Sequence, residues 1–60
     1  MTRNYALKRL LEHGGLTRVE IAHITGWSFN AVRSAIRRLL ESGEIRRTVG
    51  ARKSVYEVAR

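Results

Sequence analysis

Residues 17–45 read TRVEIAHITGWSFNAVRSAIRRLLESGEI. The first part of this stretch indicates a short helix followed by a tight turn. Thr17 and Glu20 have the spacing of a capping box, in which each side chain satisfies a free backbone N–H of the helix's first turn. Gly26 ends this helix, because glycine accepts the left-handed backbone conformation found at helix ends. The stretch therefore predicts a capped helix and a glycine-centred turn.

A longer helix over residues 29–42 follows the turn, capped by the hydroxyl group of Ser28 and ended by Gly43. At 100° per residue its apolar side chains fall within one stripe about 100° wide. These side chains are Val32, Ala35, Ile36 and Leu39. The opposite side carries Asn30, Arg33, Ser34 and Arg37. This helix therefore presents one face to a core and one polar face to solvent or a partner.

Two further segments complete the helical part of the chain. The helix that begins at Thr17 is apolar on more than one side, which predicts that it is wedged between two neighbours. Its apolar residues are Val19, Ile21, Ala22 and Ile24. Before it, an amphipathic helix begins at Thr2 or Asn4 and is ended by Gly14-Gly15. Its inward face carries Leu7, Leu10 and Leu11, and Leu16 follows as a single buried or edge-strand residue.

A β-hairpin is indicated at the end of the sequence, with strands over 45–49 and 54–58 and a tip over 50–53. Pairing Ile45 with Val58 places Arg46 opposite Glu57, which is a favourable cross-strand charge pair. The same register places Arg47 beside Tyr56. The fold class is therefore mainly α with a small β-hairpin: three helices followed by a two-stranded hairpin, in one domain over residues 1–60.

The charge of the chain is strongly positive and unevenly distributed. Of a net charge of +7, residues 33–53 contribute +5, from seven basic and two acidic side chains. A field concentrated in this way favours a polyanionic partner, and arginine suits phosphate groups and guanine edges. The alternative is an ordinary solvated basic surface, with the helix arginines as neighbours of Glu41 and the hairpin cations protecting a strand edge.

Several classes of protein are disfavoured by the composition. The sequence contains no cysteine, so disulfides and thiolate metal sites are excluded. His13 and His23 lack further ligands at metal-binding spacing, so we expect the protein to bind no metal ion. No nucleophile–base pair or carboxylate pair is evident, so we expect that it is not an enzyme and uses no cofactor or small-molecule substrate. No apolar run reaches the roughly 20 residues that span a bilayer. We therefore expect a soluble, cytoplasmic protein without membrane contact.

In the order and spacing of these motifs the chain resembles the winged helix-turn-helix family. The motifs are Glu20-Ile21-Ala22, Gly26-x-Ser28, Val32-Arg33, Ile36, Leu39, Gly43-x-Ile45 and Tyr56-x-Val58. The resemblance covers nearly the whole chain. Within the family, the chain is similar to the small regulators of bacteria, phages, plasmids and archaea. It implies a recognition helix over 28–42 in the major groove of DNA, with a wing over 45–58 on the flanking backbone or minor groove.

The resemblance and the polar helix face together suggest which side chains contact DNA. The expected base-reading residues are Asn30, Arg33, Ser34 and Arg37. The expected backbone or wing contacts are Thr17, Arg18, Ser28, Arg46, Arg47, Arg52 and Lys53. Arginine pairs with guanine and asparagine with adenine in the major groove, whereas residues at helix starts meet phosphates. Trp27 is expected in the core, and Phe29 either closes the core or contacts a thymine methyl group.

The resulting functional hypothesis is a sequence-specific, double-stranded DNA-binding transcriptional regulator, acting as a repressor or as a phage or plasmid regulator at the nucleoid. A homodimer formed through the first helix, with Tyr5 as a contact, is one hypothesis for its oligomeric state. Two alternatives remain open. One is an RNA-binding or architectural winged helix, and the other is a protein–protein adaptor that uses the basic face.

Overall fold

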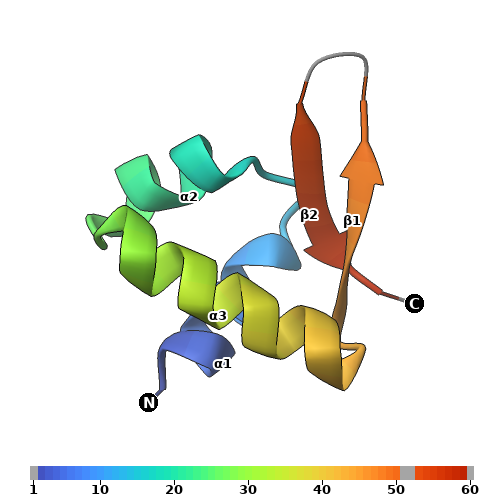
Figure 1. The fold of residues 1–60 in the computed structure, drawn as a ribbon, viewed down its shortest axis with the longest axis horizontal. Helices are drawn as coiled ribbons and strands as arrows, with labels where there is room; N and C mark the ends of the chain where they lie inside the picture. The colour runs from blue at the N-terminus through green and yellow to red at the C-terminus, as the bar shows by residue number, and fades with distance from the viewer. Residues whose placement is uncertain (1, 51–52, 60) are drawn as a thin grey trace.

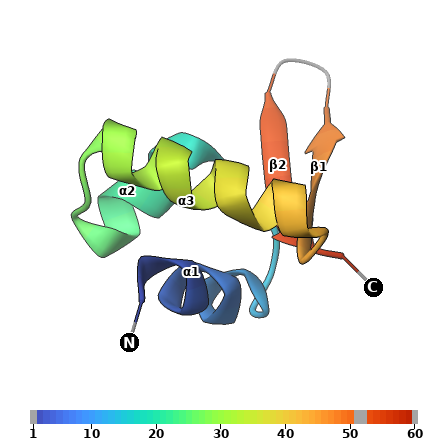
Figure 2. The ribbon, with the colours of Figure 1, turned by 60° about the horizontal axis from the view of Figure 1, so that its bottom comes forward.

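The third helix forms the centre of the molecule, and the other elements pack around it. The computed structural model describes residues 2–50 and 53–59. Its elements are α1 (Arg3–Leu11), α2 (Arg18–Thr25), α3 (Phe29–Ser42), β1 (Ile45–Val49) and β2 (Ser54–Val58). The helix α3 contacts α1, α2 and β1, and the hairpin stands beside its C-terminal end (Figure 1). A second view shows α1 beneath α3 (Figure 2). The architecture is three helices and a wing, as predicted.

The helix starts follow the capping residues of the sequence. The hydroxyl group of Thr17 accepts the backbone N–H of Glu20 at 3.2 Å, and the Glu20 carboxylate accepts the backbone N–H of Thr17 at 2.9 Å. This reciprocal pair is the predicted capping box. The hydroxyl group of Ser28 accepts the backbone N–H of Ala31 at 3.2 Å and caps α3. Local hydrogen bonds thus start α2 and α3 at the predicted residues.

Glycines in the left-handed conformation end α2 and α3. Gly26 has φ 77° and Gly43 has φ 79°, a region in which a side chain clashes with the backbone. The end of α1 differs from the prediction, because the helix stops at Leu11 and a turn precedes Gly14. The break between α2 and α3 therefore depends on one glycine, whereas the end of α1 does not.

The hairpin has the predicted register, with Ile45 paired to Val58 and Arg46 to Glu57. Leu16 extends it with an isolated antiparallel bridge to Tyr56. The N–H of Leu16 donates to the Tyr56 carbonyl at 3.0 Å, and the N–H of Tyr56 donates to the Leu16 carbonyl at 2.8 Å. The predicted edge-strand position of Leu16 is confirmed. These two bonds fix the start of α2 beside β2.

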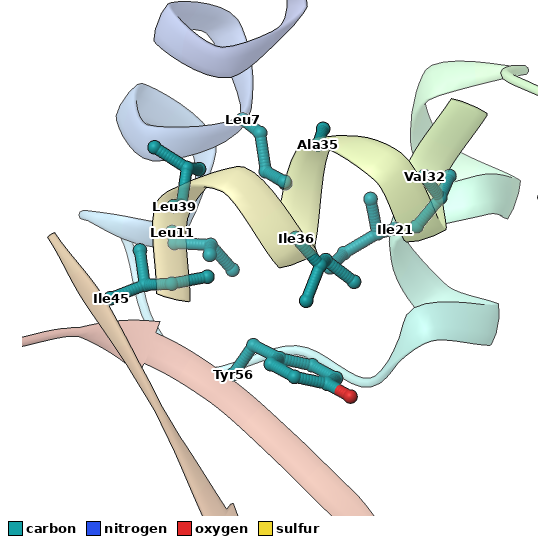
Figure 3. Packing of buried hydrophobic residues seen from close by; sticks show 9 residues of the cluster. All are labelled: Leu7, Leu11, Ile21, Val32, Ala35, Ile36, Leu39, Ile45 and Tyr56. Carbon is teal, nitrogen blue, oxygen red and sulfur yellow. The ribbon is translucent and has the colours of Figure 1, made fainter. Parts of the chain in front are cut away.

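One cluster of apolar side chains holds these elements together (Figure 3). Its buried members are Leu7, Leu11, Ile21, Val32, Ala35, Ile36, Leu39, Ile45 and Tyr56. The predicted stripe of α3 is buried completely, and every other helix and both strands contribute at least one residue. Trp27 is half-buried and packs against the cluster. Burial of this stripe turns the opposite side of α3 toward solvent.

The helix α2 contacts two neighbours, α3 and β2, as predicted, but its apolar residues are not buried on every side. Ile21 is fully buried, but Val19 is 64% exposed and Ile24 is 56% exposed. Among the described elements α2 packs against α3 and β2, so its outer side has no covering layer. The apolar side chains of Val19 and Ile24 are therefore not explained by burial in the core.

Candidate nucleic-acid interface

A continuous polar surface covers the solvent side of α3. Because the stripe through Val32 and Ile36 faces the core, residues half a turn away must face outward. The side chains on this outer side are exposed, and they are Asn30, Arg33, Ser34 and Arg37. The structure thus brings the four expected base-reading residues onto one surface.

All four of these residues also line a single hollow of about 350 Å³ between three elements. Its lining consists of Arg18, Asn30, Arg33, Ser34, Ile36, Arg37, Leu40 and Tyr56. Arg18 is the first residue of α2, and Tyr56 belongs to β2. We call this feature the wing-side hollow. It combines guanidinium, amide and hydroxyl groups, which together suit an anionic, hydrogen-bonding partner.

A second hollow of about 590 Å³ lies on the other flank of α3, toward the start of α1. It is lined by Thr2, Arg3, Asn4, Ser28, Asn30, Ala31, Ser34, Ala35 and Arg38. Ser28 therefore lies on this flank, where its hydroxyl group is engaged as the cap of α3. Asn30 and Ser34 line both hollows and mark the ridge between them.

The start of α2 adjoins the wing. Thr17, Arg18, Val19, Lys53 and Ser54 line one further hollow, which places Lys53 close to the helix start. The backbone N–H and then the hydroxyl group of Thr17 lower the pKa of Glu20, with a smaller contribution from the positive charge of Lys53. Arg18 and Lys53, expected as backbone contacts, therefore lie on the same side of the molecule.

The two arginines of β1 have different surroundings. The Nε of Arg46 donates to the Glu57 carboxylate at 2.9 Å, and this hydrogen bond is the main cause of the lowered pKa of Glu57. Arg47 is exposed and pairs in register with Tyr56, so it lies on the face of the hairpin that Tyr56 also occupies. Arg52 lies outside the described residues. The register expected from the sequence already placed Arg46 opposite Glu57 and Arg47 beside Tyr56, and the structure has both pairs.

The arginines around α3 are not neutralised by carboxylates in the described part of the chain. Three ion pairs occur there: Lys8–Glu44, Arg9–Glu12 and Arg46–Glu57. None of them includes Arg18, Arg33, Arg37, Arg38 or Arg47. Glu41 is absent from these pairs as well, so it forms no ion pair with the helix arginines in this part of the chain. The positive charge on this surface remains available to a partner.

The structure places two aromatic residues near the candidate interface. The sequence left the position of Phe29 open and did not identify Tyr56 as a site residue. Phe29 is 62% exposed at the start of α3, so it does not close the core. Tyr56 is buried, yet it lines the wing-side hollow. Its pairing with Arg47 was a sequence signal for this placement, but the reach of the ring to α3 depends on how the hairpin packs.

Over residues 2–50 and 53–59 the structure offers no grouping of three or more histidine, cysteine, aspartate or glutamate residues suited to a metal ion. Within the same residues, no helix is both long enough and apolar enough to cross a membrane.

Comparison with known proteins gives one match. A family model described as winged helix-turn-helix DNA-binding matches residues 6–46, which is more than half of the chain. The matched range extends from α1 through α3 into β1 and includes Asn30, Arg33, Ser34 and Arg37. Neither the curated proteins nor the solved structures include a match.

Proposed function

Because the chain belongs to the winged helix-turn-helix DNA-binding family, we propose that it regulates transcription by binding specific sites in duplex DNA. The supporting observation is the outer surface of α3, where Arg33, Asn30 and their neighbours are exposed beside arginines without carboxylate partners in the described residues. In this proposal α3 enters the major groove, and the wing contacts the flanking backbone or minor groove.

The N-terminal half of α3 reads bases in this proposal. A helix fits the major groove, which is about 12 Å wide, and its exposed side chains then reach the base edges. The guanidinium group of Arg33 matches the two acceptors of guanine, and the amide of Asn30 matches adenine. Ser34 and Arg37 supply further contacts one turn along the helix.

The surrounding residues hold the domain on the backbone. Arg18 and Thr17 lie at a helix start, where free N–H groups and positive charge attract phosphate. Lys53 and Arg47 extend this contact along the wing. Arg46 contributes less than Arg47, because its guanidinium group is engaged by Glu57. Ser28, on the opposite flank, and Arg52 remain part of the proposed contact set.

We further propose that two copies act together as a repressor. A single module of this size buries only about 600–1,000 Å² on DNA and reads few base pairs, so a second copy would supply specificity. Half-sites about one helical turn apart would then form a pseudo-palindrome. Tyr5, which is 53% exposed on α1, is a candidate contact between the copies.

Selection of bound fragments from a random duplex-DNA library at near-physiological salt tests the proposal. We expect an enriched motif, and its symmetry reports whether one or two copies bind. Retention of DNA without a motif would instead indicate architectural binding. Absence of retention would contradict DNA-site recognition and direct attention to hairpin RNA or an acidic protein partner.

The base-reading role of Arg33 has its own test. Arg33→Ala should weaken binding to the selected site more than binding to random DNA, by about 1–3 kcal/mol for one lost bidentate contact. Arg9→Ala is the matched control, since it removes the same charge from α1, where Arg9 pairs with Glu12. Equal weakening on both DNAs would show that Arg33 contacts only the backbone.

A further inference from the structure

Tyr56 combines a buried ring with an accessible hydroxyl group. The residue is 6% exposed, and its ring lies near Ile36 with the hydroxyl oxygen directed away from Ile45 and Leu11 (Figure 3). The hydrogen bonds found over residues 2–50 and 53–59 include none to this hydroxyl group. No fully buried side-chain oxygen in this part of the chain lacks a partner, so the hydroxyl oxygen is not fully buried. Tyr56 is one of the residues that line the wing-side hollow.

Backbone pairing places the start of α2 at the same hollow. Leu16 and Tyr56 exchange two backbone hydrogen bonds of 3.0 and 2.8 Å, and Arg18 follows two residues later. The N–H groups at the first positions of a helix have no partner within the helix. The capping box engages the N–H of Glu20 and leaves those of Arg18 and Val19 without a partner among the described backbone bonds.

The groups that meet at this point are suited to an anion. Arg18 supplies a guanidinium group, the start of α2 supplies free N–H groups and a partial positive charge, and Tyr56 supplies a hydroxyl donor. Arg37 lines the same hollow, and neither arginine belongs to an ion pair in the described residues. A tyrosine hydroxyl group without a partner among the described residues thus faces a cationic site.

We propose that Tyr56 and Arg18 form a phosphate-binding subsite that receives one phosphodiester group of the DNA backbone. This inference rests on the proposed function and adds a contact outside the expected set. The phosphodiester oxygens only accept hydrogen bonds, which matches the donors of the hydroxyl, guanidinium and N–H groups. The subsite joins the start of α2 to β2 beside α3, so a phosphate bound there would position α3 relative to the DNA backbone.

Tyr56→Phe is the decisive substitution, because it removes one oxygen and leaves the ring and the charge unchanged. Loss of a hydrogen bond to a charged group should weaken binding to the selected site and to random duplex DNA alike, by about tenfold. The slope of log affinity against log salt should stay the same, since no counterion-releasing charge is lost.

Two further measurements separate the subsite from a structural role. Arg18→Gln should reduce the magnitude of the salt slope by about 0.9, the value for one phosphate contact. The urea midpoint of Tyr56→Phe should equal or exceed that of the wild type, because its hydroxyl group has no partner among the described residues. An uncharged methylphosphonate at the contacted position should weaken both proteins, because Arg18 loses its partner in each. The loss should be larger for the wild type than for Tyr56→Phe, which has no hydroxyl bond to lose.

The outcomes distinguish failure of the subsite from failure of the proposed function. If Tyr56→Phe binds DNA like the wild type while the wild type binds its site, the subsite is wrong and the proposed function stands. A loss confined to the selected site would show a base contact in place of a phosphate contact. A lowered urea midpoint together with unchanged sensitivity to every methylphosphonate would assign the hydroxyl group a structural role. If the wild type binds no duplex DNA, both proposals fail.

Discussion

The guanidinium carbon of Arg3 lies 5.8 Å from the centroid of the Trp27 ring, which joins the start of α1 to the turn between α2 and α3. A cation at this distance is attracted to the electron-rich face of the ring. The same turn is held from the other side, because the backbone N–H of Trp27 donates to the Thr25 hydroxyl group at 3.2 Å. That hydroxyl group in turn donates to the Ile21 carbonyl at 2.8 Å. The turn that orients α3 is therefore fixed by both neighbouring helices.

The contact between Arg3 and Trp27 should be measurable by a double-mutant cycle. Arg3→Gln should lower the free energy of unfolding by about 0.5–1 kcal/mol in the wild-type background. In a Trp27→Leu background the same substitution should have almost no effect, because the ring is gone. Urea denaturation followed by circular dichroism gives the four values. Equal effects in both backgrounds would show that the ring does not hold the arginine.

Two isoleucines of α2 provide a matched test of the core. Ile21 is fully buried, so Ile21→Ala should cost about 2–5 kcal/mol through lost burial and a residual cavity. A 60-residue domain has a total stability of roughly 3–9 kcal/mol, so this variant should be largely destabilised. Ile24 is 56% exposed, and Ile24→Ala should change stability by about 0.5 kcal/mol or less. A large loss for Ile24→Ala would indicate that the outer side of α2 is covered.

The turn glycine should not tolerate a side chain well. Gly26 has φ 77°, so Gly26→Ala should cost about 1–2 kcal/mol of backbone strain. Beyond the adjacent residues, no atom lies within 4 Å of an added Cβ, so a clash with a packed neighbour is excluded as the cause. Gly26→Asn should cost less, because asparagine enters this region more readily. Thermal unfolding of both variants tests the order, and equal losses would contradict a conformational cause.

Acid should destabilise the folded state. Hydrogen bonds that their carboxylates accept lower the pKa values of Glu20, Glu44 and Glu57 in the folded chain. Groups with a lowered folded pKa stabilise the protein above their ordinary pKa of 4.5 and lose this contribution as the pH falls through the folded value. The urea midpoint should therefore be level from pH 7 to about 5 and then fall below about 4.5. Glu57→Gln should show a shallower fall, and an identical profile would contradict the role of Glu57.

The two arginines of β1 should separate stability from binding. Arg46 is bonded to Glu57, so Arg46→Gln should lower the urea midpoint and change the salt slope of DNA binding little. Arg47 has no such pair in the described residues, so Arg47→Gln should leave the midpoint unchanged and reduce the slope by about 0.9. Each variant is the charge-matched control of the other. An equal salt slope for the two variants would mean that DNA binding depends only on the net charge of the protein.

The parts of the fold that could be predicted are those set by interactions between residues close together in the sequence. The capping box of Thr17 and Glu20, the glycine at position 26 and the buried stripe of α3 were each readable from neighbouring residues. The hairpin register followed from alternation and from the charge pair of Arg46 and Glu57. The outward face of α3 followed in the same way, because a helix that buries one stripe exposes the opposite one.

The exposed side of α2 could not be read in this way. Its apolar residues satisfy a helical pattern on two sides, and only the arrangement of α3 and β2 decides which side is covered. The wing-side hollow depends on the same long-range arrangement, since it joins Arg18, α3 and Tyr56 from separate parts of the chain.

Neighbouring residues and composition are enough to specify where α2 and α3 begin and end, the hairpin register, the polar face of α3 and the positive charge beside it. These features arise from hydrogen bonds and periodicities within a few residues, or from composition. Long-range packing was needed to show that the outer side of α2 is exposed, that Arg3 lies over Trp27, and that Tyr56 lines the wing-side hollow together with Arg18. Contacts between distant segments depend on how the helices and the hairpin pack around one core, and local patterns do not specify that packing.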